Sequence, residues 1–187
     1  DDNGSTDRTP DVARAHGAEV VHEAERGYGA ACLRALDHLA SEPPDIVVFL
    51  DGDYSDHPTE LSSVVQPILF DQAEMVIGSR ATGVAERGAL SPQQRVGNAI
   101  ACSALRLLYG VEYSDLGPFR AIRWDTLQAL GMQDRNYGWT VEMQIKAAIR
   151  QVRASEIPGR YRKRIGRSKV SGTIRGVVGA GTKILWT

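Results

Sequence analysis

Residues 46–50, with the sequence IVVFL, place the strongest constraint on the fold. A run this short and this uniformly apolar is typical of a strand that is covered on both faces, as in a parallel sheet with helices on each side. We therefore predict that residues 46–50 form a central strand. Two further short runs, at residues 19–22 and 74–77, are predicted to be strands of the same sheet.

Longer stretches with helical spacing of apolar residues separate these runs, which gives the alternation of an α/β protein. Pro10 and Pro58 stand where the first turn of a helix tolerates a missing N–H. We expect a Gly-rich loop at residues 81–90, a short strand or loop at 115–123, and a strand at 154–164. The predicted helices cover residues 9–16, 28–40, 58–70, 92–109, 124–130 and 139–149.

The composition fits one globular domain over residues 1–187, because 42% of the residues are hydrophobic and no disulfide or zinc staple is needed at this length. The net charge is −1, which argues against a protein that coats nucleic acid. That balance hides an asymmetry: residues 157–187 hold eight of the 22 basic residues and no acidic residue. The two cysteines lack metal-site spacing, and no stretch resembles a signal peptide or membrane span. We expect a cytoplasmic protein, placed by its basic segment at the cytoplasmic face of the membrane.

Asp51-Gly52-Asp53 follows the strand predicted at residues 46–50. Ligands of open α/β sheets bind beyond the carboxyl ends of the strands, so both carboxylates are expected to face a binding crevice. Mg²⁺ or Mn²⁺ is typically held by one or two carboxylates together with phosphate oxygens and water. A simple Asp-Gly turn explains the same three residues equally well.

The first seven residues, DDNGSTD, precede a predicted helix. Ser5, Thr6 or Asp7 is suited to cap that helix. The same run is also suited to place carboxylates against a ribose or a base, and the two roles are compatible.

Six ordered segments resemble the family 2 glycosyltransferases of the GT-A fold, and among them the polyprenyl-phosphate sugar transferases that act on dolichyl or undecaprenyl phosphate. Residues 1–9 are similar to the family's DDGSxDxT segment, with Asn3 as an extra residue. The resemblance covers essentially the whole chain. The other five segments are residues 51–58 (DGDYSDHP), 78–80 (GSR), 115–120 (DLGPFR), 137–142 (YGWTVE) and 164–169 (RIGRSK).

The resemblance implies the transfer of one sugar, with inversion, from a nucleotide-diphosphate sugar to a polyprenyl phosphate. Asp51 and Asp53 would hold Mg²⁺ or Mn²⁺ against the diphosphate, which gives Asp53 a catalytic role. Asp115 would be the base or the carboxylate that orients the acceptor. The residues expected at the nucleotide sugar are Asp2, Ser5, Asp51, Gly52, Asp53 and Arg80.

The basic residues near the C-terminus would bind phosphate groups, since arginine suits a bidentate grip. Arg120, Arg164, Arg167 and Lys169 are expected at the acceptor phosphate or the donor diphosphate. The surplus charges of Arg160, Arg162, Lys163 and Arg175 would suit an anionic membrane surface. A solvated basic hairpin explains the same charges without any ligand.

The sequence departs from the family pattern in two places. The QxxRW string of processive polysaccharide synthases is absent, so we expect transfer of a single sugar. The family's usual first strand is also absent, so we expect the chain to be N-terminally incomplete. One alternative keeps the donor chemistry with a soluble or lipid hydroxyl as acceptor, and another is an inactive module that binds phosphate or a membrane.

Overall fold

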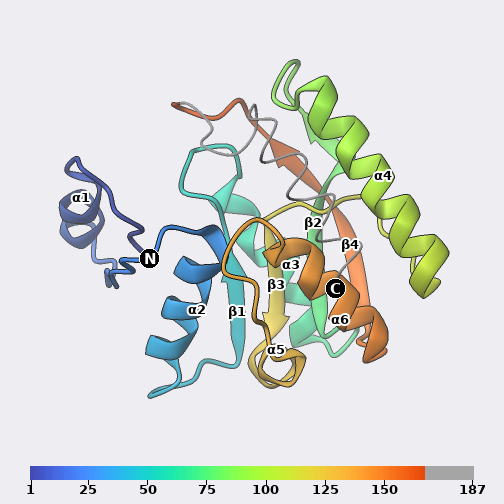
Figure 1. Cartoon of the computed structure of the whole chain (residues 1–187), viewed down its shortest axis with the longest axis horizontal. Helices are drawn as coiled ribbons and strands as arrows, with labels where there is room; N and C mark the ends of the chain where they lie inside the picture. The colour runs from blue at the N-terminus through green and yellow to red at the C-terminus, as the bar shows by residue number, and fades with distance from the viewer. Residues whose placement is uncertain (167–187) are drawn as a thin grey trace.

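The computed structural model describes residues 1–166, and it confirms an α/β fold built on a four-stranded sheet (Figure 1). The strand order is β1-β3-β2-β4. Because β3 is antiparallel to both β1 and β2, while β4 is parallel to β2, three strands run in one direction and β3 opposes them. The strands are β1 (Ile46–Phe49), β2 (Met75–Ala85), β3 (Arg120–Arg123) and β4 (Ala154–Tyr161).

The prediction that residues 46–50 form a central strand is wrong. β1 lies at an edge of the described sheet, because β3 inserts between β1 and β2 and pairs with both. Of the four residues of β1 only Val47 is buried, and Leu50 beyond the strand is 39% exposed. A uniformly apolar run therefore marked a strand correctly but not its place in the sheet.

Two other strand boundaries differ from the prediction. β2 continues to Ala85 through the first half of the predicted Gly-rich loop, because it stays paired with β4 as far as Ala85 and Tyr161. An irregularity in this pairing falls between Ser79 and Val84. Residues 19–22 form no strand; they contribute one isolated bridge, between Asp2 and His22.

All six predicted helices are present, with small shifts at their ends. The 58–70 prediction divides into a 3₁₀ turn (η1, Pro58–Glu60) and α3. α4 is the longest helix, and it begins with a capping box between Ser91 and Gln94 and ends at Gly110 in the left-handed conformation. None of the helices described for residues 1–166 is both long and apolar enough to cross a membrane. The helices are α1 (Thr9–Ala15), α2 (Tyr28–Leu39), α3 (Leu61–Leu69), α4 (Pro92–Tyr109), α5 (Trp124–Leu130) and α6 (Trp139–Ile149).

Helices cover both faces of the sheet, and the alternation along β2 separates the two cores. Met75 and Ile77 pack with residues of α2, α5 and α6, while Val76 packs with α3. Trp139 at the start of α6 is buried and meets the ring of Phe49 edge-on. α1 buries no residue and lies apart from the sheet (Figure 1).

One row of paired residues across the sheet sets the position of the site. Arg120 of β3 is paired with both Phe49 of β1 and Ile77 of β2, and Ile77 is paired in turn with Glu156 of β4. Since β3 runs against its neighbours, the segment that precedes it reaches the same edge of the sheet as the segment that follows β1. Three segments therefore meet at the end of the sheet where β1 ends and β3 begins: DGD, GSR and DLGPFR.

The start of α2 packs against the turn at residues 134–136. The backbone N–H groups of Gly29 and Ala30 donate to the carbonyls of Asn136 and Arg135 at 3.1 and 2.9 Å. A Cβ atom on Gly29 would lie 1.9 Å from the carbonyl oxygen of Asp134, whereas a Cβ atom on Gly97 of α4 would meet nothing within 4 Å. Position 29 in α2 therefore has no room for a side chain, whereas position 97 in α4 has room for one.

We predict opposite effects for the same substitution in these two helices. Gly29→Ala should lower the free energy of unfolding by about 1–3 kcal/mol, because the backbone must move to admit the methyl group. Gly97→Ala should raise it by about 0.5–1 kcal/mol, because alanine is the better helix former in open space. Urea denaturation followed by circular dichroism measures both, and equal effects of the two substitutions would contradict the packing described here.

Candidate functional site

The loop after β1 gathers three acidic side chains, those of Asp51, Asp53 and Asp56. Oδ1 of Asp53 accepts a hydrogen bond from the N–H of Ser55 at 2.9 Å and another from its hydroxyl. Oδ2 of Asp53 is buried, accepts no hydrogen bond, and forms an ion pair with the guanidinium of Arg164. Asp56 is 3% exposed, and its carboxylate accepts the N–H of Asp51 at 3.2 Å.

Burial and mutual repulsion raise the pKa values of two of these carboxyl groups. The pKa of Asp51 is raised by burial first and by the charge of Asp53 second, although the charges of Arg164 and Arg80 oppose the shift. Burial raises the pKa of Asp56 to about 6. A nearby cation stabilises the charged form of a carboxyl group that is buried beside another carboxylate.

The chain that follows β4 holds this loop in place. The N–H groups of Arg162 and Ile165 donate to the carbonyls of Ser55 and Asp53 at 2.8 and 2.9 Å. The guanidinium of Arg162 lies 3.5 Å from the centre of the Tyr54 ring, where a cation–π interaction is favourable. Arg162 and Ile165 therefore help to hold the loop in its conformation.

Two of the surplus basic residues have partners within the protein. Arg160 forms an ion pair with Glu60, and Arg162 stacks on Tyr54 and donates to the carbonyl of Asp56 at 2.6 Å. The Arg160 side chain is still 56% exposed, and contact of these residues with a membrane surface stays a prediction. Arg167, Lys169 and Arg175 lie outside the described residues.

The residues of this loop suit a divalent cation that shares its coordination with a substrate. In residues 1–166, no three His, Cys, Asp or Glu side chains are arranged as a closed metal site. Asp51 and Asp53 nevertheless offer two carboxylates, and Oδ2 of Asp53 lacks a hydrogen-bond donor and already faces a positive charge. Two carboxylates completed by phosphate oxygens and water are the common protein contribution to a Mg²⁺ or Mn²⁺ site.

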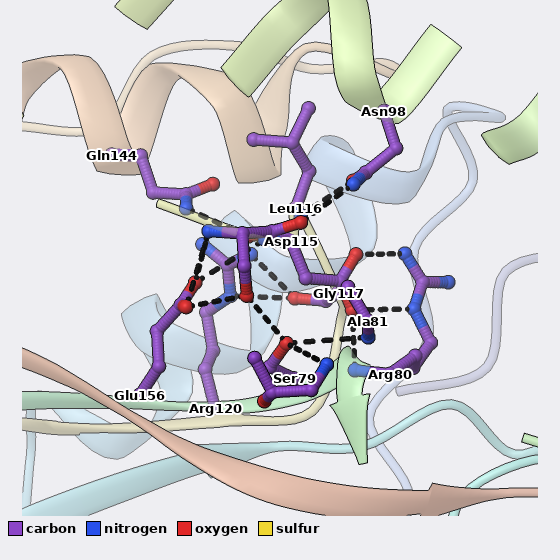
Figure 2. Close-up of polar contacts among 12 residues, drawn as sticks. Ser79, Arg80, Ala81, Asn98, Asp115, Leu116, Gly117, Arg120, Gln144 and Glu156 are labelled. Atoms are coloured by element: carbon purple, nitrogen blue, oxygen red, sulfur yellow. Dashed lines mark hydrogen bonds and ion pairs between the residues drawn. The ribbon is translucent and has the colours of Figure 1, made fainter. Parts of the chain in front are cut away.

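Asp115 and Arg80 form a buried ion pair beside this loop (Figure 2). The carboxylate of Asp115 accepts the backbone N–H, Nε and Nη2 of Arg80 at 2.7, 2.8 and 2.7 Å. Burial opposes the charge of Arg80, but the hydrogen bonds and charge of Asp115 outweigh it and raise the pKa of the guanidinium. Both oxygens of Asp115 are therefore engaged with Arg80, which favours the orienting role over that of a base.

Side chains from three elements fix the turn that carries Asp115 (Figure 2). Asn98 of α4 donates to the carbonyl of Ser114 at 2.8 Å and accepts the N–H of Leu116 at 2.9 Å. Gln144 of α6 donates to the carbonyl of Asp115 at 3.0 Å, and Glu156 of β4 accepts the N–H groups of Ser114 and Asp115. Sequence reasoning missed these three residues, because only the strand register and helix packing bring them to the turn.

Arg120 does not have the role predicted for it. Its side chain is fully buried, and its guanidinium donates to the carbonyls of Gly117 and Thr140, both at 3.1 Å through Nε and Nη1. Burial lowers the pKa of this group. Arg120 therefore joins the turn before β3 to the start of α6, and it offers no exposed surface to an acceptor phosphate.

A cleft of about 460 Å³ opens between the outer part of β2 and α4. Asp51 and Asp53 are not among its lining residues. The charge of Arg80 opposes the rise in the pKa of Asp51, so Arg80 of the cleft interacts electrostatically with the acidic loop. The cleft brings two arginines, a carboxylate and amide groups to one cavity. Among its lining residues are Arg80, Leu90, Gln94, Arg95, Asn98 and Asp115.

The N-terminal segment is tied to the chain before α2. The amide of Asn3 donates to the carbonyls of Glu23 and Glu25 and accepts the N–H of Gly27 at 2.9 Å. Hydrogen bonding to Ser5 lowers the pKa of Asp2, whose carboxylate accepts the Ser5 N–H at 3.2 Å. α1 begins at Thr9, and its N–H is accepted by Asp7 rather than by Ser5. The predicted contacts of Asp2, Ser5 and Gly52 with a nucleotide sugar remain predictions.

We predict that Asp115→Ala will lower the free energy of unfolding by about 3–5 kcal/mol, because it leaves the Arg80 charge buried without its partner. Asp115 is 2% exposed and the Arg80 side chain is 15% exposed. Glu112→Ala breaks the Arg106 ion pair, whose side chains are both more than 70% exposed, and should cost less than about 1 kcal/mol. Denaturation curves of both variants test this, and equal losses would argue against a buried, essential pair.

Comparison with known proteins identifies relatives over most of the chain. An uncharacterized glycosyltransferase of Mycobacterium tuberculosis is 36% identical over 179 residues, which cover 95% of this chain and 79% of that protein. A dolichyl-phosphate hexose transferase of Haloferax volcanii is 32% identical over 169 residues, covering 90% of this chain and 71% of the relative.

Among solved structures, glucosyl-3-phosphoglycerate synthase of M. tuberculosis has the same fold. Its complex with Mn²⁺, UDP-glucose and phosphoglyceric acid matches with a TM-score of 0.73 and 23% identity, over 98% of this chain and 65% of that one. This likeness confirms the GT-A fold. Residues 2–157 match the family described as "Glycosyl transferase family 2", and the chain belongs to this family of glycosyltransferases.

Proposed function

We propose that this glycosyltransferase moves one sugar, with inversion at the anomeric carbon, from a nucleotide-diphosphate sugar to a polyprenyl phosphate. The observation that carries the proposal is the cleft next to the acidic loop, which is lined by Arg80 and Arg95. A pair of arginines suits an anionic acceptor, and the aspartates of the neighbouring loop suit a metal-bound diphosphate. The similarity to a dolichyl-phosphate hexose transferase supports the same acceptor class.

On the donor side, Asp51 and Asp53 would hold Mg²⁺ or Mn²⁺. The bound ion supplies Lewis-acid chemistry that neutralises charge on the departing nucleoside diphosphate. The hydrogen bonds from Ser55 fix one oxygen of Asp53 and leave the other turned toward Arg164. The complex of glucosyl-3-phosphoglycerate synthase with Mn²⁺ and UDP-glucose supports a metal-dependent donor.

On the acceptor side, Arg80, which the sequence placed at the nucleotide sugar, would instead bind the acceptor phosphate, since Asp115 fixes its guanidinium at the wall of the cleft. A phosphate monoester is already anionic at neutral pH, so its oxygen attacks without a general base. The ion pair then contributes by orientation, which lowers the entropic part of the barrier. Arg95 of α4 lines the same cleft and would neutralise the remaining phosphate charge.

The state of Asp115 also separates this proposal from the alternative with a hydroxyl acceptor. A hydroxyl group needs a base to take its proton, and a base must be within hydrogen-bond reach of that proton. Asp115 has both oxygens committed to Arg80, so it is poorly placed to serve as that base. An anionic acceptor needs no such group.

The decisive experiment incubates the full-length protein with Mn²⁺, a nucleotide sugar (UDP-glucose and GDP-mannose in parallel) and a short polyprenyl phosphate. We expect release of nucleoside diphosphate and formation of a glycosylated lipid phosphate. Arg95→Gln should raise KM for the lipid phosphate by about tenfold or more, the usual worth of a charge-assisted hydrogen bond.

Arg106→Gln is the matched control for that experiment, because Arg106 lies on α4 but forms an ion pair with Glu112 and does not line the cleft. Its kinetics should equal those of the unmodified protein. Release of nucleoside diphosphate only with polyprenol or other hydroxyl acceptors would refute the proposed acceptor. No release above the level of Asp53→Ala with any acceptor would support the inactive module instead.

For the metal, we predict that Asp51→Asn and Asp53→Asn each weaken Mn²⁺ binding by at least about tenfold, because each removes a charged ligand. Electron paramagnetic resonance of free Mn²⁺ measures this without any sugar transfer, and calorimetry with UDP-glucose should show donor binding that no longer depends on metal. Asp37→Asn is the control, since Asp37 pairs with Arg34 on α2 at the surface. Unchanged Mn²⁺ affinity in both loop variants would show that these aspartates are not the metal ligands.

A further inference from the structure

Glu156 is an acidic residue on β4 that directs its carboxylate at the turn before β3 (Figure 2). Its two oxygens accept the N–H of Ser114 at 3.0 and 3.1 Å, the hydroxyl of Ser114 at 2.6 Å, and the N–H of Asp115 at 3.2 Å. A carboxylate that accepts several hydrogen bonds from one turn holds that turn in a single conformation. The next side chain in the turn is that of Asp115, which grips Arg80.

The same carboxylate also acts on Arg80 from the other side, through Ser79. Because the Ser114 hydroxyl donates to Glu156, the hydrogen bond of 2.7 Å between the two serine hydroxyls must be donated by Ser79. Oγ of Ser79 is then free to accept the N–H groups of Ala81 and Thr82, at 3.3 and 3.2 Å. The backbone on both sides of Arg80 is thus ordered by a chain of donors that ends at Glu156.

We propose that Glu156 is a positioning residue for sugar transfer: it fixes Ser114 and Asp115, and through them it holds the Arg80 guanidinium in the acceptor cleft. Glu156 does not line that cleft, so it acts through Arg80 and not on the acceptor directly. The consequence for catalysis rests on the proposed function, whereas the positioning of Arg80 does not.

The positioning is tested without substrate, by the Nε–H resonance of Arg80 in the NMR spectrum of the full-length protein. This proton lies in a hydrogen bond of 2.8 Å to Asp115, and its signal is assigned by its loss in Arg80→Lys. Glu156→Gln should shift or broaden the signal, because the amide group presents a donor to the N–H groups of the turn. An unchanged signal in folded Glu156→Gln would overturn the proposal.

Two further variants keep this test decisive. Glu74→Gln is the matched control. Glu74 lies just before β2, and its carboxylate accepts the N–H of Arg153, just before β4, at 3.0 Å. This substitution should leave the Arg80 signal unchanged. If Glu156→Gln does not fold, Ser114→Ala replaces it as the test. This substitution removes the hydroxyl that joins Glu156 to Ser79, and it should shift or broaden the Arg80 signal in the same way. A normal Arg80 signal in Ser114→Ala would then overturn the proposal.

Kinetics with the short polyprenyl phosphate tests the consequence for transfer. Glu156→Gln should raise KM for the acceptor about tenfold, with little change in KM for the nucleotide sugar. Combined with Arg80→Gln, it should add little to the loss caused by Arg80→Gln alone, since both act through one guanidinium. Additive losses would contradict the route through Arg80, and an unmodified protein that transfers no sugar would refute the proposed function while the NMR result stands.

Discussion

The site depends on one buried ion pair, between Asp115 and Arg80. Such a pair is costly to form, because both charges leave water, and it is retained only where further hydrogen bonds satisfy the groups around it. Here the backbone N–H of Arg80 supplies one of these bonds, and Glu156, Gln144 and Asn98 fix the turn from behind. The pair also joins β2 to the segment before β3, and both of its residues line the cleft.

The local elements were largely predictable from the sequence, but their arrangement was not. Helical spacing and proline position located six helices, because these signals act over one or two turns of chain. The antiparallel insertion of β3 between β1 and β2 depends on pairing between distant residues, such as Ile77 with Arg120, and Phe49 with Arg120, which are more than 70 positions apart. No local pattern in residues 46–50 records that neighbour, so the strand was expected at the centre of the sheet and lies at an edge.

The candidate site shows the same division. Short motifs found Asp51, Asp53, Arg80 and Asp115, which the structure gathers at one edge of the sheet. They did not distinguish Arg80, whose guanidinium reaches a cleft, from Arg120, whose guanidinium is buried against two carbonyls. The sequence identifies a charged residue but not its partner. Whether that partner is a ligand or the protein's own backbone depends on how the chain packs.

The contact between Arg164 and Asp53 links the acidic loop to the chain beyond β4 thermodynamically. A divalent ion bound at Asp53, as proposed, would be repelled by the Arg164 guanidinium, and this repulsion would weaken ion binding. By reciprocity, a bound ion would weaken the ion pair between Asp53 and Arg164 by the same free energy. If the proposed ion binds there, the concentration of divalent cation would set the strength of the contact between Arg164 and the acidic loop, even without a sugar nucleotide.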